Sequence, residues 1–182
     1  MYGNKLDPSE TASIVYNNLL RRLQHTHKTS GLTLLQMEHF LKIRIHRGKN
    51  LLDELKQDMY KKELIEYDWN GIIASTKALL QLFSVVTSPD ECLRVILKLI
   101  QDIQKGIENA FQHTKDTGSD ELTPTVIYIL GCCGELLIKQ RALLTIRIIY
   151  VLLGPSLKNG IEDFCISVFE GALYKLTGAD EK

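Results

Sequence analysis

Apolar residues recur at helical spacing along nearly the whole chain. Steps of three, four and seven residues separate them in each long segment, which is the pattern of amphipathic helices. No segment alternates apolar and polar residues with a period of two, so strands are not expected. The pattern predicts an all-α protein of about eight helices. Four of these predicted helices span residues 33–47, 50–67, 124–138 and 141–153. Two more are predicted to begin at Asp68 and near Asn159.

The longest apolar stretch, residues 122–154, predicts two consecutive helices that form a central hairpin. Thr123 is expected to cap the first of them, with Pro124 as its first helical residue, and Gly154 ends the second. Four charged side chains interrupt the stretch, so no run of about 20 apolar residues could span a membrane. These charged residues are Glu135, Lys139, Arg141 and Arg147.

Two other helix starts combine a capping residue, a proline and a glutamate. They are Asp7-Pro8-Ser9-Glu10 and Ser88-Pro89-Asp90-Glu91, an arrangement that satisfies the first free amides of a helix. The starts at Asp7, Ser88 and Thr123 are unevenly spaced, and no repeat of constant length is found. We therefore predict one domain, residues 1–182, folded as an irregular bundle around the central hairpin. A short HEAT- or armadillo-like helical array is the alternative.

Several single positions are expected to pack in the core. Trp69 precedes an apolar helix and is expected to anchor it, and Gly131-x-x-Gly134 is expected to let two helices approach closely. The helix after Ser88 carries a continuous apolar stripe. In the last helix the predicted buried stripe is Ile161, Phe164, Cys165, Val168, Ala172, Leu173 and Leu176, with Gly178 at the end.

The composition is that of an ordinary globular protein, with 45 % hydrophobic and 24 % charged residues. The net charge is zero, but residues 1–62 carry 11 basic and 6 acidic side chains, so this part is positive and the remainder negative. The four cysteines lie in apolar helical patterns, and no signal peptide precedes them, which predicts reduced thiols and an intracellular location, cytoplasmic or nuclear.

No residue pattern for catalysis, a cofactor or a metal stands out. The histidines are His25, His27, His39, His46 and His113, and none has the spacing of a metal-ligand pair. Each cysteine lies in an apolar pattern, where a reactive thiolate is disfavoured. We therefore expect a non-enzymatic protein without cofactor, metal or small-molecule substrate.

A cluster of basic residues surrounds the end of the second predicted helix: Lys42, Arg44, Arg47 and Lys49. Cations are favoured at a helix C-terminus, and this alone is enough to explain the cluster. The alternative is a surface that binds an acidic partner, because few acids lie nearby in sequence to neutralise it. No aromatic side chains are interleaved for base stacking, so a nucleic acid is an unlikely partner.

Two short segments resemble known families. Asp68-Trp69-Asn70-Gly71-Ile72 resembles the segment that opens the central helices of Bcl-2-like bundles. The segment from Asp120 to Tyr128, with Pro124 inside it, resembles the acidic–proline–apolar segment of VPS9 domains, which catalyse nucleotide exchange on Rab-type GTPases. This resemblance implies that Asp120 is the acid that destabilises the nucleotide and Pro124 the proline at the helix start. The tyrosine that the family has before its last helices is missing near Ile161.

The sequence favours a non-enzymatic protein–protein interaction domain, an adaptor or a subunit of a larger assembly, with protein partners. Its apolar helix faces are broad and need neighbours around them. A VPS9-like nucleotide-exchange factor and a Bcl-2-like regulatory bundle are the two alternatives.

Overall fold

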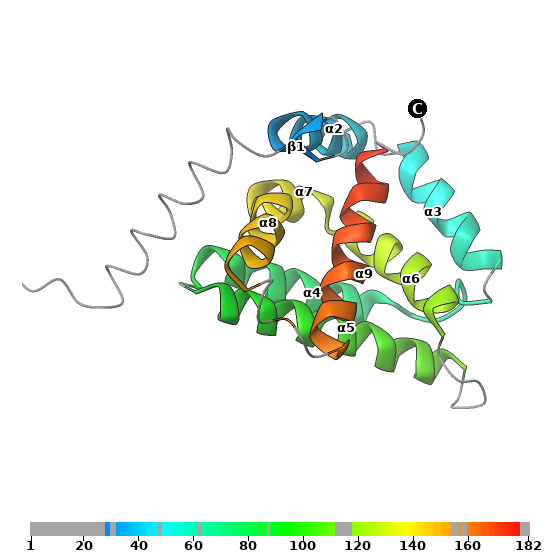
Figure 1. The fold of residues 1–182 in the computed structure, drawn as a ribbon. Helices are drawn as coiled ribbons and strands as arrows, with labels where there is room; N and C mark the ends of the chain where they lie inside the picture. The colour runs from blue at the N-terminus through cyan, green and yellow to red at the C-terminus, as the bar shows by residue number, and fades with distance from the viewer. Residues whose placement is uncertain are drawn as a thin grey trace, which may run out of the picture.

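The protein is described from a computed structural model, which covers residues 28–29, 32–46, 49–61, 63–86, 88–111, 118–153, 157 and 160–178. The helix expected after Asp7 lies outside these ranges. Within them the chain forms eight α-helices, which confirms the irregular all-α bundle (Figure 1). The helices are α2 (Leu34–His46), α3 (Lys49–Lys61), α4 (Asn70–Gln81), α5 (Pro89–Ala110), α6 (Ser119–Cys132), α7 (Gly134–Lys139), α8 (Ala142–Leu153) and α9 (Gly160–Thr177).

Two short elements complete the described chain. A 3-10 turn, η1 (Leu82–Ser84), follows α4, and two-residue strands, β1 (Lys28–Thr29) and β2 (Leu32–Thr33), pair antiparallel before α2. The expectation of no strands is wrong for this one pair. Two residues on each side are too few to build a sheet, so the fold class is unaffected.

The helices stack in three levels, with α4 and α5 below, α6 to α9 in the middle and α2 and α3 above (Figure 1). Helix α9 is the central element, because it packs against α2, α5, α6 and α8. Its most deeply buried large side chain is Phe169, whose ring meets that of Phe83 edge-on with centroids 6.5 Å apart. None of the described helices combines the length and apolarity that crossing a membrane would need.

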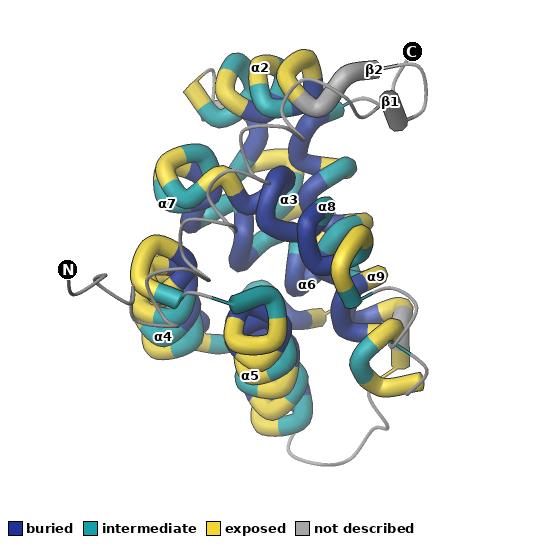
Figure 2. Tube along the Cα trace, turned by 60° about the vertical axis from the view of Figure 1, so that its left-hand side comes forward, coloured by how far each residue is buried: buried dark blue, intermediate teal, exposed yellow. Residues whose placement is uncertain are grey.

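Helix α5 follows its sequence pattern closely. The hydroxyl of Ser88 accepts a hydrogen bond from the amide of Glu91 at 3.3 Å, and Pro89 is the first helical residue. The predicted stripe from Leu93 to Ile107 is buried, whereas the opposite side of the helix is exposed (Figure 2). Both the start and the buried face of α5 are therefore confirmed.

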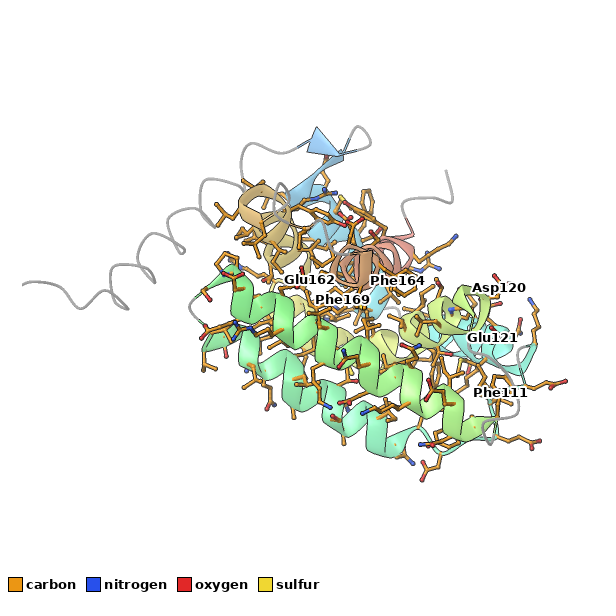
Figure 3. All side chains as sticks on the ribbon, turned by 60° about the horizontal axis from the view of Figure 1, so that its bottom comes forward. Phe111, Asp120, Glu121, Glu162, Phe164 and Phe169 are labelled. Carbon is orange, nitrogen blue, oxygen red and sulfur yellow. The ribbon has the colours of Figure 1, made fainter. Side chains whose placement is uncertain are left out.

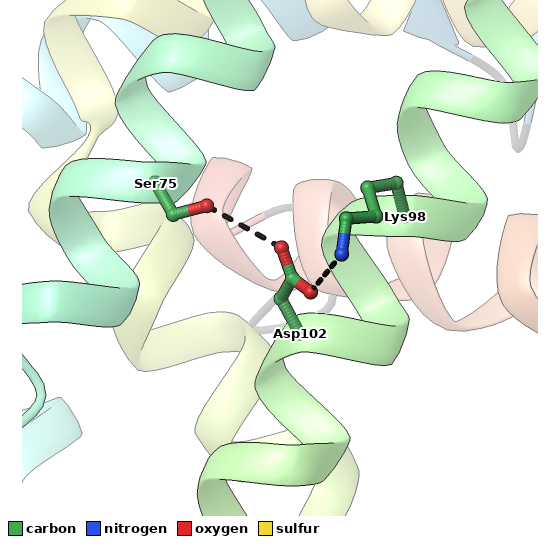
Figure 4. Close-up of polar contacts among 3 residues, drawn as sticks. All are labelled: Ser75, Lys98 and Asp102. Atoms are coloured by element: carbon green, nitrogen blue, oxygen red, sulfur yellow. Dashed lines mark hydrogen bonds and ion pairs between the residues drawn. The ribbon is translucent and has the colours of Figure 1, made fainter.

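Helices α4 and α5 are joined by a polar contact and by the packing of Trp69. The carboxylate of Asp102 accepts a hydrogen bond from Ser75 on α4 at 3.3 Å and pairs with Lys98 at 2.6 Å (Figure 4). Trp69 is buried, its indole N–H donates to the carbonyl of Leu64 at 2.9 Å, and its ring lies against Gly106. The prediction that Trp69 is a core anchor is confirmed.

The central apolar stretch forms three helices, not two. Helix α6 ends at Cys132, the short α7 follows from Gly134, and Arg141 adopts a left-handed conformation, with φ of 50°, before α8. The predicted single helix over 124–138 is therefore wrong in both bounds. Its start was placed at Pro124, but α6 begins five residues earlier.

Two further boundaries or registers differ from the predictions. Helix α3 was expected to reach residue 67 but ends at Lys61, and Glu63 follows with φ of 61°, which interrupts a helix. In α9 the predicted stripe is wrong at its start, because Ile161 and Phe164 are exposed, while Ile166 and Phe169 are buried. The second half of that stripe, from Ala172 onward, is buried as predicted.

The glycines of Gly131-x-x-Gly134 lie where helices approach closely, as predicted. A Cβ on Gly131 would lie 2.7 Å from Leu55 Cδ1 of α3. A Cβ on Gly134 would lie between 2.7 and 2.9 Å from three side-chain carbons of Ile45 on α2. The Ile45 carbons include Cγ1 and Cγ2, which are fixed by β-branching and cannot swing away. Gly134 therefore sets how closely α2 can pack.

We expect Gly134→Ala to lower the free energy of unfolding by about 1–3 kcal/mol, because the added methyl group overpacks this contact. The matched control is Gly171→Ala on the exposed side of α9, where a Cβ would meet nothing within 4 Å. That change should stabilise the protein by up to about 1 kcal/mol through helix propensity. Urea unfolding of the two variants measures the contrast, and equal midpoints would refute the steric role of Gly134.

Candidate functional site

The start of α6 presents two neighbouring acids in different environments. Gly118 precedes the helix, and its amide donates to Glu121 Oε2 at 3.2 Å. The Glu121 residue is 7 % exposed, so this acid closes the helix end as a structural cap. Both Asp120 and Glu121 lie in the first turn, where negative charge favours the helix dipole.

Asp120 is exposed and has no part in this cap. Its carboxylate makes no hydrogen bond or ion pair within the described part of the chain. Pro124 is half-buried and is the sixth residue of α6, so it has no N–H to donate to the Asp120 carbonyl four residues earlier. Pro124 therefore lies inside the helix and not at its start, contrary to the prediction. The Asp120 carboxylate is exposed in the first turn of α6, where it can contact a partner.

The start of α9 exposes two large apolar side chains. Ile161 is 70 % and Phe164 44 % exposed. They are accompanied by the acids Glu162 and Asp163 in the first turn of the helix. Two exposed apolar side chains at one helix end form a surface that a protein partner could cover.

These two helix starts lie on the same side of the molecule. Helices α6 and α9 pack against each other, and both begin at the lower side of the fold in Figure 1. In Figure 3, which looks onto that side, Phe164 lies on the side of α9 that faces α6, and Asp120 lies at the near end of α6. We call Asp120, Ile161 and Phe164 the α6–α9 surface.

The predicted basic cluster is divided by the structure. Lys42 is exposed, whereas Arg44 is partly buried and its Nη2 lies 3.4 Å from Glu54 Oε2 of α3. The expectation that too few acids lie nearby to neutralise the cluster is therefore wrong for Arg44. Arg47 and the side chain of Lys49 lie outside the described residues. That the four residues bind a partner stays a prediction.

Three of the cysteine thiols have raised pKa values, which disfavour the reactive thiolate form. Burial raises the pKa of Cys132 and Cys165, and it raises that of Cys133 to about 12. All four cysteines are free. Among the described residues, no group of three or more histidine, cysteine or acidic side chains is placed to hold a metal ion. The described chain thus offers no nucleophile of this kind at the α6–α9 surface.

Comparison with protein families identifies the fold. The model of the vacuolar sorting protein 9 (VPS9) domain matches residues 73–181, more than half of the chain. The chain belongs to the VPS9 domain family. Neither a curated protein nor a solved structure is similar enough to count as a match. Membership of this family makes protein–protein interaction the role of the domain, and no comparison supports the Bcl-2-like alternative.

The VPS9 match separates the two candidate surfaces. It runs from residue 73, in the first turn of α4, to residue 181, beyond the end of α9, and it includes Asp120, Pro124, Ile161 and Phe164. The basic residues from Lys42 to Lys49 precede it. Helices α2 and α3 also precede it, yet they pack on α9 and α6 of the VPS9 domain. The α6–α9 surface is therefore the better candidate for the site of this family's activity.

Ile161 and Phe164 were missed as surface residues because the sequence allowed a helical stripe that included them. The available signal was a competing stripe in the same helix, through Ile166 and Phe169. Both stripes cannot be buried over their whole length on one helix. The sequence pattern alone did not select between them.

Proposed function

We propose that this VPS9 domain is a guanine-nucleotide exchange factor for a Rab-type GTPase and acts through the α6–α9 surface. The observation that carries the proposal is the position of Asp120 within the family match, at the exposed start of α6, beside the apolar start of α9. The resemblance in the segment from Asp120 to Tyr128 agrees with it. Such a factor changes no covalent bond of a small molecule, in keeping with the absence of a catalytic residue pattern in the sequence.

In this proposal Asp120 acts by charge. A bound guanine nucleotide carries negative phosphates and is held with a divalent cation. A carboxylate brought to this site repels the phosphates and competes for the cationic groups that hold them. Asp120 can make this contact because Glu121, and not Asp120, closes the end of α6. The affinity of the GTPase for its nucleotide then falls while the domain is bound.

The apolar residues of α9 supply binding in this proposal. Ile161 and Phe164 would be covered by the GTPase, and burial of such side chains contributes about 1.5–3 kcal/mol each when complete. Ile161 lies near the position at which the family resemblance calls for a tyrosine. The chain has no hydroxyl there, so its contact at this point is apolar. The proposal places the protein inside the cell, where Rab-type GTPases act.

The experiment is release of fluorescent GDP from a Rab5-type GTPase. We expect the wild-type chain to accelerate release and Asp120→Ala to reduce the acceleration at least tenfold, about 1.4 kcal/mol of lost transition-state stabilisation. Asp90→Ala is the matched control, because Asp90 is also an exposed acid in the first turn of a helix, α5. Each change should cost about 0.3–1 kcal/mol of stability.

Two results would count against the proposal. If the wild-type chain does not change GDP release from any Rab-type GTPase tested, the exchange function is refuted and the adaptor function remains. An Asp120→Ala variant as active as Asp90→Ala would show that exchange does not use this carboxylate.

A further inference from the structure

A cavity of about 330 Å³ lies between α2 and the junction of α7 and α8. Three buried leucines, Leu41, Leu137 and Leu143, form its apolar part. Polar side chains of Glu38, His39, Lys42 and Arg141 also line it. The volume and the mixed lining are those of a small-molecule site. The cavity is on the opposite side of the fold from the starts of α6 and α9 (Figure 1).

Glu38 is the unusual residue of this cavity. Its Oε1 atom is shielded from solvent and has no hydrogen-bond partner among the residues that the structure describes. A buried carboxylate oxygen without a donor costs free energy, so native structures seldom retain one without a reason. Burial raises the pKa of Glu38, and attraction to Arg141 opposes that rise. The Oε1 atom is free to accept a hydrogen bond from a donor that enters the cavity.

Arg141 is held beside the cavity by an uncommon backbone conformation. Its φ of 50° is in the left-handed region, which costs a non-glycine residue of order 1 kcal/mol or more. Its carbonyl accepts the first amides of α8, from Leu144 and Thr145, at 3.0 Å each. Glycine would fit this turn without strain. An exposed arginine at this position therefore provides a positive charge at the cavity, with Lys42 as a second one.

We infer that this cavity binds a small zwitterion with an apolar body, the chemistry of a free aliphatic α-amino acid. An ammonium group would donate to Glu38 Oε1, a carboxylate would meet Arg141 and Lys42, and a branched side chain would cover the three leucines. An ammonium ion alone would be repelled by the two cations. A carboxylate alone would leave Glu38 Oε1 without a hydrogen-bond donor. A ligand with both groups would pair with all three charged side chains of the lining, Glu38, Lys42 and Arg141.

The inference can be tested by titrating the isotope-labelled chain of residues 1–182 with L-leucine and recording amide chemical shifts. Concentrations up to about 20 mM reveal a Kd in the millimolar range. We expect saturable shifts confined to α2, α7 and α8. Isoamylamine, which lacks the carboxylate, and isocaproate, which lacks the amine, should each bind at least tenfold more weakly. Absence of saturable binding by leucine, or equal binding by either half-ligand, would overturn the inference.

Two variants test the assigned groups, and neither is expected to unfold the protein. Glu38→Gln removes a charge that partial burial disfavours, and Arg141→Gly relieves a strained backbone, so both should unfold at or above the wild-type temperature. Each should weaken leucine binding at least tenfold. Glu135→Gln is the control, because Glu135 is an exposed carboxylate of α7 that does not line the cavity. Wild-type affinity in Glu38→Gln or in Arg141→Gly would refute the site.

Discussion

Replacement of Arg147 by methionine is expected to lower the free energy of unfolding by about 2–4 kcal/mol. Arg147 Nη2 lies 3.0 Å from Glu170 Oε1, and the two side chains are only 17 % and 16 % exposed. Arg147 also lies over the ring of Tyr174, whose hydroxyl donates to the same carboxylate oxygen at 2.9 Å. Methionine keeps the packing volume but leaves Glu170 as a buried charge without its cation, which is the costly way to break such a pair.

A double variant and an exposed pair provide the controls. Arg147→Met with Glu170→Gln should recover most of the lost stability, because the amide still accepts from Tyr174 and carries no charge. Lys61→Met breaks the exposed pair with Asp58, whose separation is 3.4 Å, and should change stability by less than about 1 kcal/mol. Urea unfolding of the three variants and the wild type measures these differences. A double variant no more stable than Arg147→Met would show that the uncompensated charge is not the cause.

The effect of pH on Arg147→Met follows from the pKa of Glu170. Burial raises this pKa above its ordinary value of 4.5, while Arg147 and a hydrogen bond from Tyr150 lower it. A carboxyl with a raised pKa takes up a proton more readily in the folded state, so its contribution to stability grows as the pH falls. Loss of Arg147 raises the pKa further. The defect of Arg147→Met should therefore be smaller at about pH 5 than at about pH 7.5.

Local signals in the sequence predicted some helix ends and missed others. The start of α5 was predictable because Ser88, Pro89 and Glu91 perform their roles within four consecutive residues. The start of α6 was not, because the sequence pattern favours Pro124 as the first residue of the helix. The helix is instead capped by the hydrogen bond from the Gly118 amide to the Glu121 carboxylate. Such a cap does not change the spacing of apolar residues along the sequence.

Long-range packing decided what the sequence left open. Helix α9 had two possible apolar faces, and its contacts with α2, α5, α6 and α8 bury the one with Phe169 and leave Phe164 outside. Arg44 looked unpaired because no acid adjoins it in sequence, yet Glu54 reaches it from the following helix. Contacts between helices are not encoded in the periodicity of either helix.

The candidate site was only half predictable for the same reason. Asp120 was found through the family resemblance of its segment, since an exposed acid at a helix start is otherwise an ordinary feature. Ile161 and Phe164 became visible as a surface only after α9 was placed. The two halves come from helices about 40 residues apart, and their proximity is a property of the bundle.

Phe164→Asp is expected to reduce nucleotide exchange about a hundredfold or more if the proposed function is correct. The change removes an apolar contact and places a charge in a surface that the GTPase would cover, and about 2.7 kcal/mol of lost binding corresponds to this factor. Because Phe164 is 44 % exposed in the free domain, its replacement should leave the unfolding midpoint nearly unchanged. The loss should therefore appear in exchange at low GTPase concentration and not in stability.

The matched control for Phe164→Asp is Leu82→Asp on η1, where the side chain has a similar exposure of 41 % but lies outside the α6–α9 surface. This variant should exchange nucleotide at the wild-type rate. High GTPase concentration should restore part of the activity of Phe164→Asp, since binding is impaired, but should not restore Asp120→Ala, in which the charge that weakens nucleotide affinity is gone. If Phe164→Asp exchanges as fast as Leu82→Asp, the GTPase does not cover the start of α9. The partner contact would then have to be sought at Lys42 and its basic neighbours, on the helices that precede the matched segment.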